Sequence, residues 1–279
     1  MKIAITGAGG FVGRHVAARL RDHTIQPVSI RSGVTARDFA GCDAVIHLAG
    51  EPVAQRWARQ VREKIRASRV EGTRAVVAAL RADPPKVLIS ASAIGYYGSR
   101  GDEILTESAT PGDDFLARIA VQWEREAIAA GSFGVRVVLP RISMVLGRDG
   151  GALAKMLTPF RLGAGGRLGN GRQWMSWIHI EDLVSLIAFA LESDVSGPIN
   201  AAAPNPVTNA EFTRALARAV HRPAIFPVPK LALRAVFGEM AEMVLASQRV
   251  VPEAALRAGF AFRFPELGPA LGDLIGAPR

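Results

Sequence analysis

The chain has only one cysteine among its 279 residues, Cys42, so no disulfide can form within it. A single thiol fits a reducing cytoplasm, and its place in an apolar run indicates a core residue rather than a nucleophile. No run of eighteen uninterrupted apolar residues is present, which excludes a membrane-spanning helix. The chain opens directly on a predicted strand, which leaves no room for a signal peptide. We therefore predict a cytoplasmic protein without a membrane partner.

Tyrosine is equally scarce, with two residues in the whole chain, while lysine and arginine exceed the acidic residues to give a net charge of +9. Such an excess can indicate a nucleic-acid partner. The arginines, however, are spread at roughly helical spacing, and no motif of stacking aromatic residues accompanies them. We interpret the charge as a solvated surface with a few phosphate-facing members, and expect neither a nucleic-acid partner nor a metal site.

What the chain does contain, at its N-terminus, is a glycine-rich turn. Residues 2–5 read as a short buried strand, and Val12, Val16 and Leu20 mark the apolar stripe of the helix that follows. Between the strand and the helix, the glycines form the pattern G-x-x-G-x-x-G at residues 7, 10 and 13. The first allows a tight turn, the second lets a pyrophosphate approach the backbone, and the third lets the helix pack closely on the sheet. We predict a dinucleotide site at Gly7, Gly10, Phe11, Val12 and Gly13.

The stretch T-G-x-x-G-x-x-G at residues 6–13 resembles the extended short-chain dehydrogenase/reductase superfamily, whose members include nucleotide-sugar epimerases. A second predicted strand, residues 26–30, ends in Arg31 and Ser32. An acidic residue at such a strand end binds the ribose 2′-hydroxyl of NAD, whereas an arginine accommodates the 2′-phosphate of NADP. No acid is present, so Arg31 and Ser32 predict NADP(H).

The third predicted strand ends in H-L-A-G, residues 47–50. In the extended superfamily this position lies along the cofactor, and the resemblance implies that Leu48, Ala49 and Gly50 line it. We expect His47 to point into the sheet as a core residue. A long helix is predicted next, with Trp57 in its first half.

The fourth predicted strand, from residue 86, leads into the loop S-A-S-A-I-G-Y-Y-G. Active sites of open α/β sheets lie at the carboxyl ends of the strands. The resemblance matches Ser92 to the family's hydroxyl residue that polarises the substrate oxygen. Ser90 is the alternative for this role, and we expect it to lie beside the cofactor. Tyr96 and Tyr97, in the same loop, are the only phenols that could act as proton donor.

The superfamily's Y-x-x-x-K motif is absent. Its tyrosine transfers the proton, and its lysine lowers the pKa of that phenol from about 10. The corresponding helix, residues 114–124, has Phe115, Ile119 and Trp123 on its apolar face and contains neither tyrosine nor lysine.

The second half of the chain supplies a core strand over residues 135–140, followed by Arg141, which either serves a cofactor phosphate or ties the loop. Residues 161–172 are glycine-rich and predict a mobile lid or a hairpin, with arginines suited to an anionic substrate. The segment 174–182 resembles the superfamily's W-I-H-x-x-D-L segment, at which the chain returns to the main domain. Leu231 to Gln248 predicts one long helix, and a terminal helix follows.

The sequence resembles one atypical subfamily over essentially the whole chain. The resemblance rests on the stretch L-R-A-V-F-G-E-M-A-E-M-V-L-A-S-Q-R-V-V-P together with four shorter motifs: R-W…S-R-V-E-G-T-R, S-A-I-G-Y-Y-G, W-I-H-I-E-D and G-F-x-F-R-F-P. The subfamily is short-chain dehydrogenase/reductase family 39U. The resemblance implies NADP(H) binding without the usual Tyr/Lys pair, and it supplies no substrate.

The predicted fold class is α/β, a doubly wound parallel sheet of the Rossmann type with a small, mainly helical C-terminal lobe. We assign residues 1–147 and 174–203 to the NADP(H)-binding domain, and 148–173 and 204–279 to the lid and C-terminal lobe. The predicted function is an NADP(H)-dependent oxidoreductase or epimerase acting on a small polar substrate, anionic or nucleotide-linked. The alternative is a sensor or regulatory protein that binds NADP(H) without turnover. A homodimer is left open.

Overall fold

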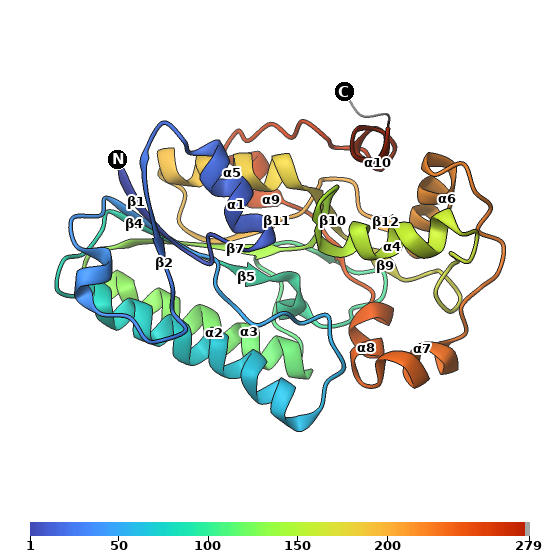
Figure 1. Cartoon of the computed structure of the whole chain (residues 1–279), viewed down its shortest axis with the longest axis horizontal. Helices are drawn as coiled ribbons and strands as arrows, with labels where there is room; N and C mark the ends of the chain where they lie inside the picture. The colour runs from blue at the N-terminus through green and yellow to red at the C-terminus, as the bar shows by residue number, and fades with distance from the viewer. Residues whose placement is uncertain (277–279) are drawn as a thin grey trace.

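A parallel sheet forms the centre of the computed structural model, which describes residues 1–276 (Figure 1). Its strands follow the spatial order β11-β7-β4-β3-β1-β2, and the short β5 also pairs with β7. Every pairing in this sheet is parallel, so all the strands end at the same edge. They are β1 (Lys2–Thr6), β2 (Thr24–Val28), β3 (Ala44–His47), β4 (Val87–Ser90), β5 (Ser92–Ala93), β7 (Arg136–Ile142) and β11 (Gly197–Ala201).

Helices cover both faces of the sheet, which confirms the predicted doubly wound architecture (Figure 1). On one face lie α1 (Phe11–Arg19), α5 (Ile180–Glu192) and α9 (Glu253–Arg257). On the other lie α2 (Arg59–Leu80) and α3 (Phe115–Ile128). Short 3-10 turns occur at 36–39, 94–97 and 129–133.

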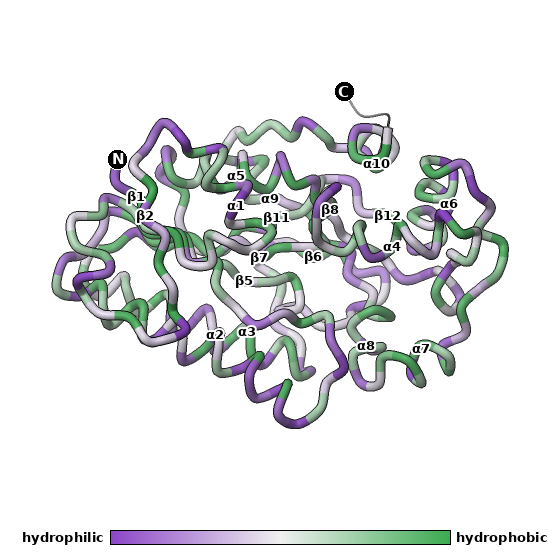
Figure 2. Tube along the Cα trace, viewed as in Figure 1, coloured by the Kyte–Doolittle hydropathy of each residue, from purple (hydrophilic) through white to green (hydrophobic). Residues whose placement is uncertain are grey.

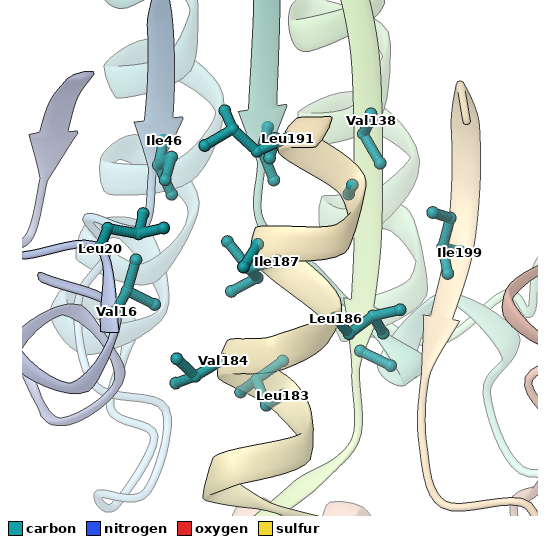
Figure 3. Packing of buried hydrophobic residues seen from close by; sticks show 14 of the residues in the cluster. Val16, Leu20, Ile46, Val138, Leu183, Val184, Leu186, Ile187, Leu191 and Ile199 are labelled. Carbon is teal, nitrogen blue, oxygen red and sulfur yellow. The ribbon is translucent and has the colours of Figure 1, made fainter. Parts of the chain in front are cut away.

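The central core lies between the sheet and α5 (Figure 3). Strand residues such as Ile46, Val138 and Ile199 point toward the apolar face of α5, where Leu186 and Ile187 are almost fully buried. Because both faces are covered, the strands read as continuous apolar runs instead of alternating ones. This is why the sequence locates them well.

A smaller lobe surrounds a second apolar cluster built from α4, α6 and α10. Phe160, Phe212 and Leu271 are among its buried members. Three two-stranded pairs, β8–β10, β9–β12 and β6–β13, connect the lobe to the main sheet. The elements are α4 (Gly151–Arg161), α6 (Asn209–Ala219), α7 (Lys230–Phe237), α8 (Met240–Leu245), α10 (Leu267–Ile275), β6 (Ile104–Leu105), β8 (Met144–Gly147), β9 (Trp174–Met175), β10 (Trp177–His179), β12 (Val207–Thr208) and β13 (Arg249–Val250).

Three sequence predictions about elements need correction. The single helix expected over 231–248 is two helices, α7 and α8, because Gly238 between them has a left-handed φ of 60°. The hairpin expected over 161–172 does not pair with itself; instead Leu168 forms a parallel bridge to Val228. Trp57 precedes α2, and its indole N–H donates to the Val53 carbonyl at 2.9 Å. No helix in residues 1–276 is both long and apolar enough to cross a membrane.

Candidate functional site

The glycine turn joins β1 to α1 at the carboxyl edge of the sheet. The Gly10 N–H donates to the Gly7 carbonyl at 2.9 Å, and α1 begins at the next residue. A Cβ atom on Gly13 would lie 2.1 Å from that same carbonyl oxygen, so only glycine fits there. The first N–H groups of α1 have no partner within the helix and face this edge, where a phosphate would accept hydrogen bonds from them.

A second glycine cluster holds Phe11, one of the predicted cofactor residues. Its half-buried ring packs on the loop between β8 and α4, where a Cβ atom on Gly147 or Gly150 would lie 2.4 Å from a ring carbon. Arg14 of α1 donates to the Asp149 carboxylate at 2.7 Å. The start of α1 is therefore fixed against the beginning of α4.

The predicted NADP(H) residues Arg31 and Ser32 lie just beyond β2, on the same edge as the glycine turn. The register pairs Val28, the last residue of β2, with Thr6, the last residue of β1. Both Arg31 and Ser32 are exposed, and Arg31 has no ion-pair partner in residues 1–276. Their donors are free for an anionic group.

The end of β3 closes the other side of the turn. A Cβ atom on Gly7 would lie 2.9 Å from the Ala49 nitrogen, so the backbone of residues 48–50 runs directly alongside the glycine turn. Leu48, Ala49 and Gly50 therefore lie beside the glycine turn, and their contact with a cofactor stays a prediction.

His47 is fully buried, as its sequence position predicts. Its Nδ1 lies 2.6 Å from Thr6 Oγ1, and its Nε2 lies 2.9 Å from Thr73 Oγ1. Burial lowers the pKa of this imidazole to about 4. The ring is thus neutral and structural, and it ties β1, β3 and α2 together.

We predict that His47 makes the fold sensitive to acid. The folded protein holds the imidazole neutral down to about pH 4, whereas the unfolded chain protonates it near 6.5. Between these values the unfolded state binds more protons, so stability falls as pH decreases. From pH 7.5 to 5.0 this residue should account for a loss of about 2 kcal/mol. Urea unfolding of the wild type and His47→Asn at both pH values measures it; equal pH dependence in the two proteins would contradict this role.

Arg69 is a site residue whose role the sequence did not show. Its guanidinium is half-buried beside Gly50, and Nη1 donates to the Glu51 carbonyl at 3.0 Å. Burial lowers the pKa of Arg69 to about 10, and no carboxylate in residues 1–276 forms an ion pair with it. Its place in the middle of the long helix α2 gave no signal of this contact in the sequence. It supplies a cation beside Gly50, next to the glycine turn.

Ser92 belongs to a buried polar network on the neighbouring strands. Its hydroxyl donates to Glu124 Oε1 of α3 at 2.6 Å. The same carboxylate accepts two hydrogen bonds from Arg141, from Nε and Nη2, both at 2.9 Å. All three residues are at most 6% exposed. Glu124 was not predicted, because nothing local in the sequence connects residue 124 of a helix with a serine thirty-two positions earlier.

Arg141 is therefore engaged inside the protein and does not serve a cofactor phosphate. Burial would lower the pKa of its guanidinium, but the Glu124 carboxylate raises it overall. Of the two predicted roles, the structure supports the tie to neighbouring segments, since Nη1 also donates to the Tyr97 hydroxyl at 2.9 Å.

The two tyrosines have different environments. Tyr97 is fully buried and donates to Asn200 Oδ1 at 2.6 Å, and burial raises its pKa to about 12. Such a phenol is a poor proton donor at neutral pH, so the structure argues against the catalytic role predicted for it. Tyr96 is half-buried, and the guanidinium carbon of Arg141 lies 3.5 Å from the centre of its ring. It remains the phenol with access to a ligand.

Ser90 connects the two halves of the site. It is the last residue of β4, opposite His47 of β3 in the register, and its buried hydroxyl has no hydrogen-bond partner in residues 1–276. The glycine turn, Arg31, Ser32 and residues 48–50 form the candidate cofactor cradle at the ends of β1, β2 and β3. It lies along the same edge as the Ser92 network at β5 and β7, with Ser90 between them.

Helix α3, which contains neither tyrosine nor lysine, begins at an aromatic residue, Phe115. Phe115 packs edge-to-face on Trp57 with ring centroids 5.4 Å apart, and the Arg62 guanidinium lies 4.2 Å from its ring. These residues line a surface cavity of about 370 Å³ with further charged side chains. The other lining residues are Arg59, Glu63, Arg66 and Glu239.

Comparison with known proteins gives two matched regions. Residues 3–202 match the NAD dependent epimerase/dehydratase family, and residues 228–274 match a domain of unknown function, DUF1731. The chain is 40% identical to the epimerase family protein SDR39U1 homolog, chloroplastic, of Arabidopsis thaliana, covering 99% of this chain and 87% of that protein. It is 37% identical to the epimerase family protein YfhF of Bacillus subtilis, covering 99% and 98%.

Solved structures show the same similarity. Human epimerase family protein SDR39U1, crystallised with NADPH, superposes with a TM-score of 0.90 at 35% identity and covers 99% of both chains. A nucleoside-diphosphate sugar epimerase of Corynebacterium glutamicum gives 0.82 at 34% identity, covering 99% of this chain and 58% of that one. UDP-glucuronic acid 4-epimerase of Bacillus cereus in complex with NAD superposes with a TM-score of 0.79 at 17% sequence identity, which shows a likeness of fold alone.

Proposed function

Because the chain belongs to the NAD dependent epimerase/dehydratase family, we propose that it binds NADP(H) and catalyses an oxidoreductase or epimerase reaction on a small polar substrate, anionic or nucleotide-linked. The predicted resemblance to family 39U is confirmed by relatives of that type along 99% of the chain. That human SDR39U1 was crystallised with NADPH supports the choice of cofactor.

The residues present fit this cofactor. Gly10 would let a pyrophosphate approach the backbone at the start of α1, and Gly13 lets α1 pack closely on the turn after β1. Arg31 and Ser32 would hold the 2′-phosphate, and residues 48–50 would lie along the ribose. When bound, the nicotinamide supplies hydride transfer; the chain supplies position and polar contacts.

Ser92 would make the polar contact to the substrate. The observation that carries the proposal is its fixed hydroxyl, which donates to the buried Glu124 carboxylate at 2.6 Å beside an intact cofactor cradle. Because the hydroxyl hydrogen is committed to Glu124, the Ser92 oxygen would meet a ligand as a hydrogen-bond acceptor. Ser92 would thus orient a substrate hydroxyl, and Tyr96 is the phenol available to move its proton.

A binding protein without turnover is the second candidate. Two observations favour it: α3 contains neither a tyrosine nor a lysine, and the hydroxyl of Tyr97 is held by Arg141 and Asn200. In that case the same cradle would sense the cofactor, and the Ser92 network would only stabilise the fold.

Substitution of Ser92 separates the two candidates. In a screen of nucleotide-linked sugars and small anionic carbonyl compounds, reduction is followed by loss of NADPH absorbance and epimerisation by chromatography of the products. We expect Ser92→Ala to lower kcat by about 10²–10⁴. NADPH affinity should stay unchanged, and Ser92→Thr, which keeps a hydroxyl, should retain part of the activity. If Ser92→Ala turns over like the wild type, the catalytic role assigned to Ser92 is wrong. Turnover of no substrate, with NADPH bound, would favour the sensor.

A further inference from the structure

The net charge of the chain is concentrated in one part of the fold. Residues 150–173 and 212–238 contain nine lysines and arginines and no aspartate or glutamate, while the other 25 basic residues are balanced by 25 acidic ones. These two segments, which we call the basic lobe, therefore carry the whole excess of +9. This differs from the even scatter of arginines that the sequence suggested. The nine are Lys155, Arg161, Arg167, Arg172, Arg214, Arg218, Arg222, Lys230 and Arg234.

All nine side chains face solvent without an opposite charge. Each is exposed, and none forms an ion pair with any residue in 1–276. Elsewhere the same chain pairs its arginines repeatedly, as Arg74 does with Glu126 at 2.7 Å. The field of the basic lobe is therefore not neutralised locally, and it favours an anionic surface.

The basic lobe also holds the five most exposed large apolar side chains of the described residues. Their exposed fractions lie between 65% and 79%, whereas no other large apolar side chain exceeds 54%. Single exposed apolar residues are ordinary, but a group of them marks an interaction surface. The five are Leu162, Ile225, Phe226, Leu231 and Val236.

Contacts bring the two segments of the basic lobe together. Arg222 donates to the Arg161 carbonyl at 3.2 Å, the Gly169 N–H donates to the Val228 carbonyl at 2.9 Å, and α7 begins two residues later. Helix α7 buries only Leu233 and exposes most of its other residues. The helix and the loop before it form one end of the molecule, and Figure 2 shows hydrophobic residues along α7 there.

We propose that the basic lobe binds the surface of an anionic phospholipid bilayer. A surface that combines apolar side chains with unpaired cations inserts the former among acyl chains and places the latter at the headgroups. A second copy of this chain fits poorly, because a contact between two basic lobes would bring unpaired cations against unpaired cations. A nucleic acid would use the cations but not Leu162, Ile225 or Leu231, which offer no stacking surface. This inference replaces our expectation that the protein has no membrane partner, and it does not depend on the proposed catalysis.

Co-sedimentation with vesicles tests this surface. We expect the full-length protein to bind vesicles of phosphatidylcholine mixed with phosphatidylglycerol, and to bind pure phosphatidylcholine at least tenfold more weakly. Each cation near an anionic surface is worth about 1 kcal/mol, which is roughly fivefold in affinity. Lys230→Ala with Arg234→Ala should therefore weaken binding by about 25-fold. Phe226→Ser with Leu231→Ser should weaken it by at least about tenfold.

Matched pairs outside the basic lobe serve as controls. Arg19→Ala with Arg21→Ala removes two exposed, unpaired cations, and Ile128→Ser with Leu256→Ser removes two exposed apolar side chains. Both should bind anionic vesicles like the wild type, and an NADPH titration of every variant reports separately on folding. The proposal is wrong if anionic vesicles are not bound, or if the control pairs lose as much affinity as the lobe pairs. It is also wrong if a DNA duplex binds as tightly as the vesicles and the apolar pair changes neither affinity.

Discussion

Replacing Glu124 with alanine should destabilise the protein by about 3–5 kcal/mol, because it leaves the buried Arg141 guanidinium without its carboxylate. Glu124 accepts from Ser92 and twice from Arg141, and both partners are at most 3% exposed. For a chain of this size the expected fall in Tm is roughly 10 °C. Thermal unfolding followed by circular dichroism measures it.

The matched control for this substitution lies two residues further along the same helix. Glu126 also pairs with an arginine in two contacts, at 2.7 and 3.0 Å, but Arg74 is mostly exposed. A solvent-exposed pair contributes about 0–1 kcal/mol, so Glu126→Ala should change stability little. If the two alanine variants melt within about 2 °C of one another, the Ser92–Glu124–Arg141 network does not stabilise the fold as described.

Gly13→Ala should abolish the cofactor cradle and destabilise the main domain. The added Cβ atom would lie 2.1 Å from the Gly7 carbonyl oxygen, a backbone atom that cannot move without shifting α1 from β1. Overpacking of this kind typically costs about 1–3 kcal/mol, and the displaced helix start should reduce NADPH affinity at least 100-fold. Urea unfolding and a fluorescence titration with NADPH measure the two effects.

Gly9 provides the control for stability in the same turn. A Cβ atom there would have no neighbour within 4 Å, so Gly9→Ala should unfold at the wild-type urea concentration. Equal stability of Gly13→Ala and Gly9→Ala would show that the close approach of α1 to β1 is not needed.

Much of the fold could be predicted because its signals are local. The inner strands β1, β3 and β4 are buried on both faces and appear as short apolar runs, and the glycine turn is a contiguous motif. His47 was correctly expected in the core from its place at the end of such a run.

The errors arose where tertiary context decides. The apolar pattern over 231–248 continues through Gly238, so only the left-handed backbone at that residue reveals two helices. The glycine-rich segment 161–172 suggested a mobile lid or a hairpin; the hairpin does not form, and Leu168 instead forms an isolated bridge to Val228, sixty residues away.

The candidate site shows the same division. The glycines, Arg31, Ser32 and residues 48–50 were found from motifs and strand ends, and the structure places them along one edge of the sheet. The Ser92 network was only half visible. Glu124 and Arg141 come from α3 and β7, and the ion pair that joins them to Ser92 exists only after the sheet has formed.

Our central claim is that this protein is built around an NADP(H) site in which Arg31 selects the 2′-phosphate. The most direct test is a fluorescence titration of the wild type and Arg31→Ala with NADPH and, separately, with NADH. The wild type should bind NADPH at least tenfold more tightly, about 1.4 kcal/mol, and Arg31→Ala should lose this preference while its affinity for NADH is unchanged. Binding of neither cofactor, or an equal preference for NADPH in the variant, would contradict the claim.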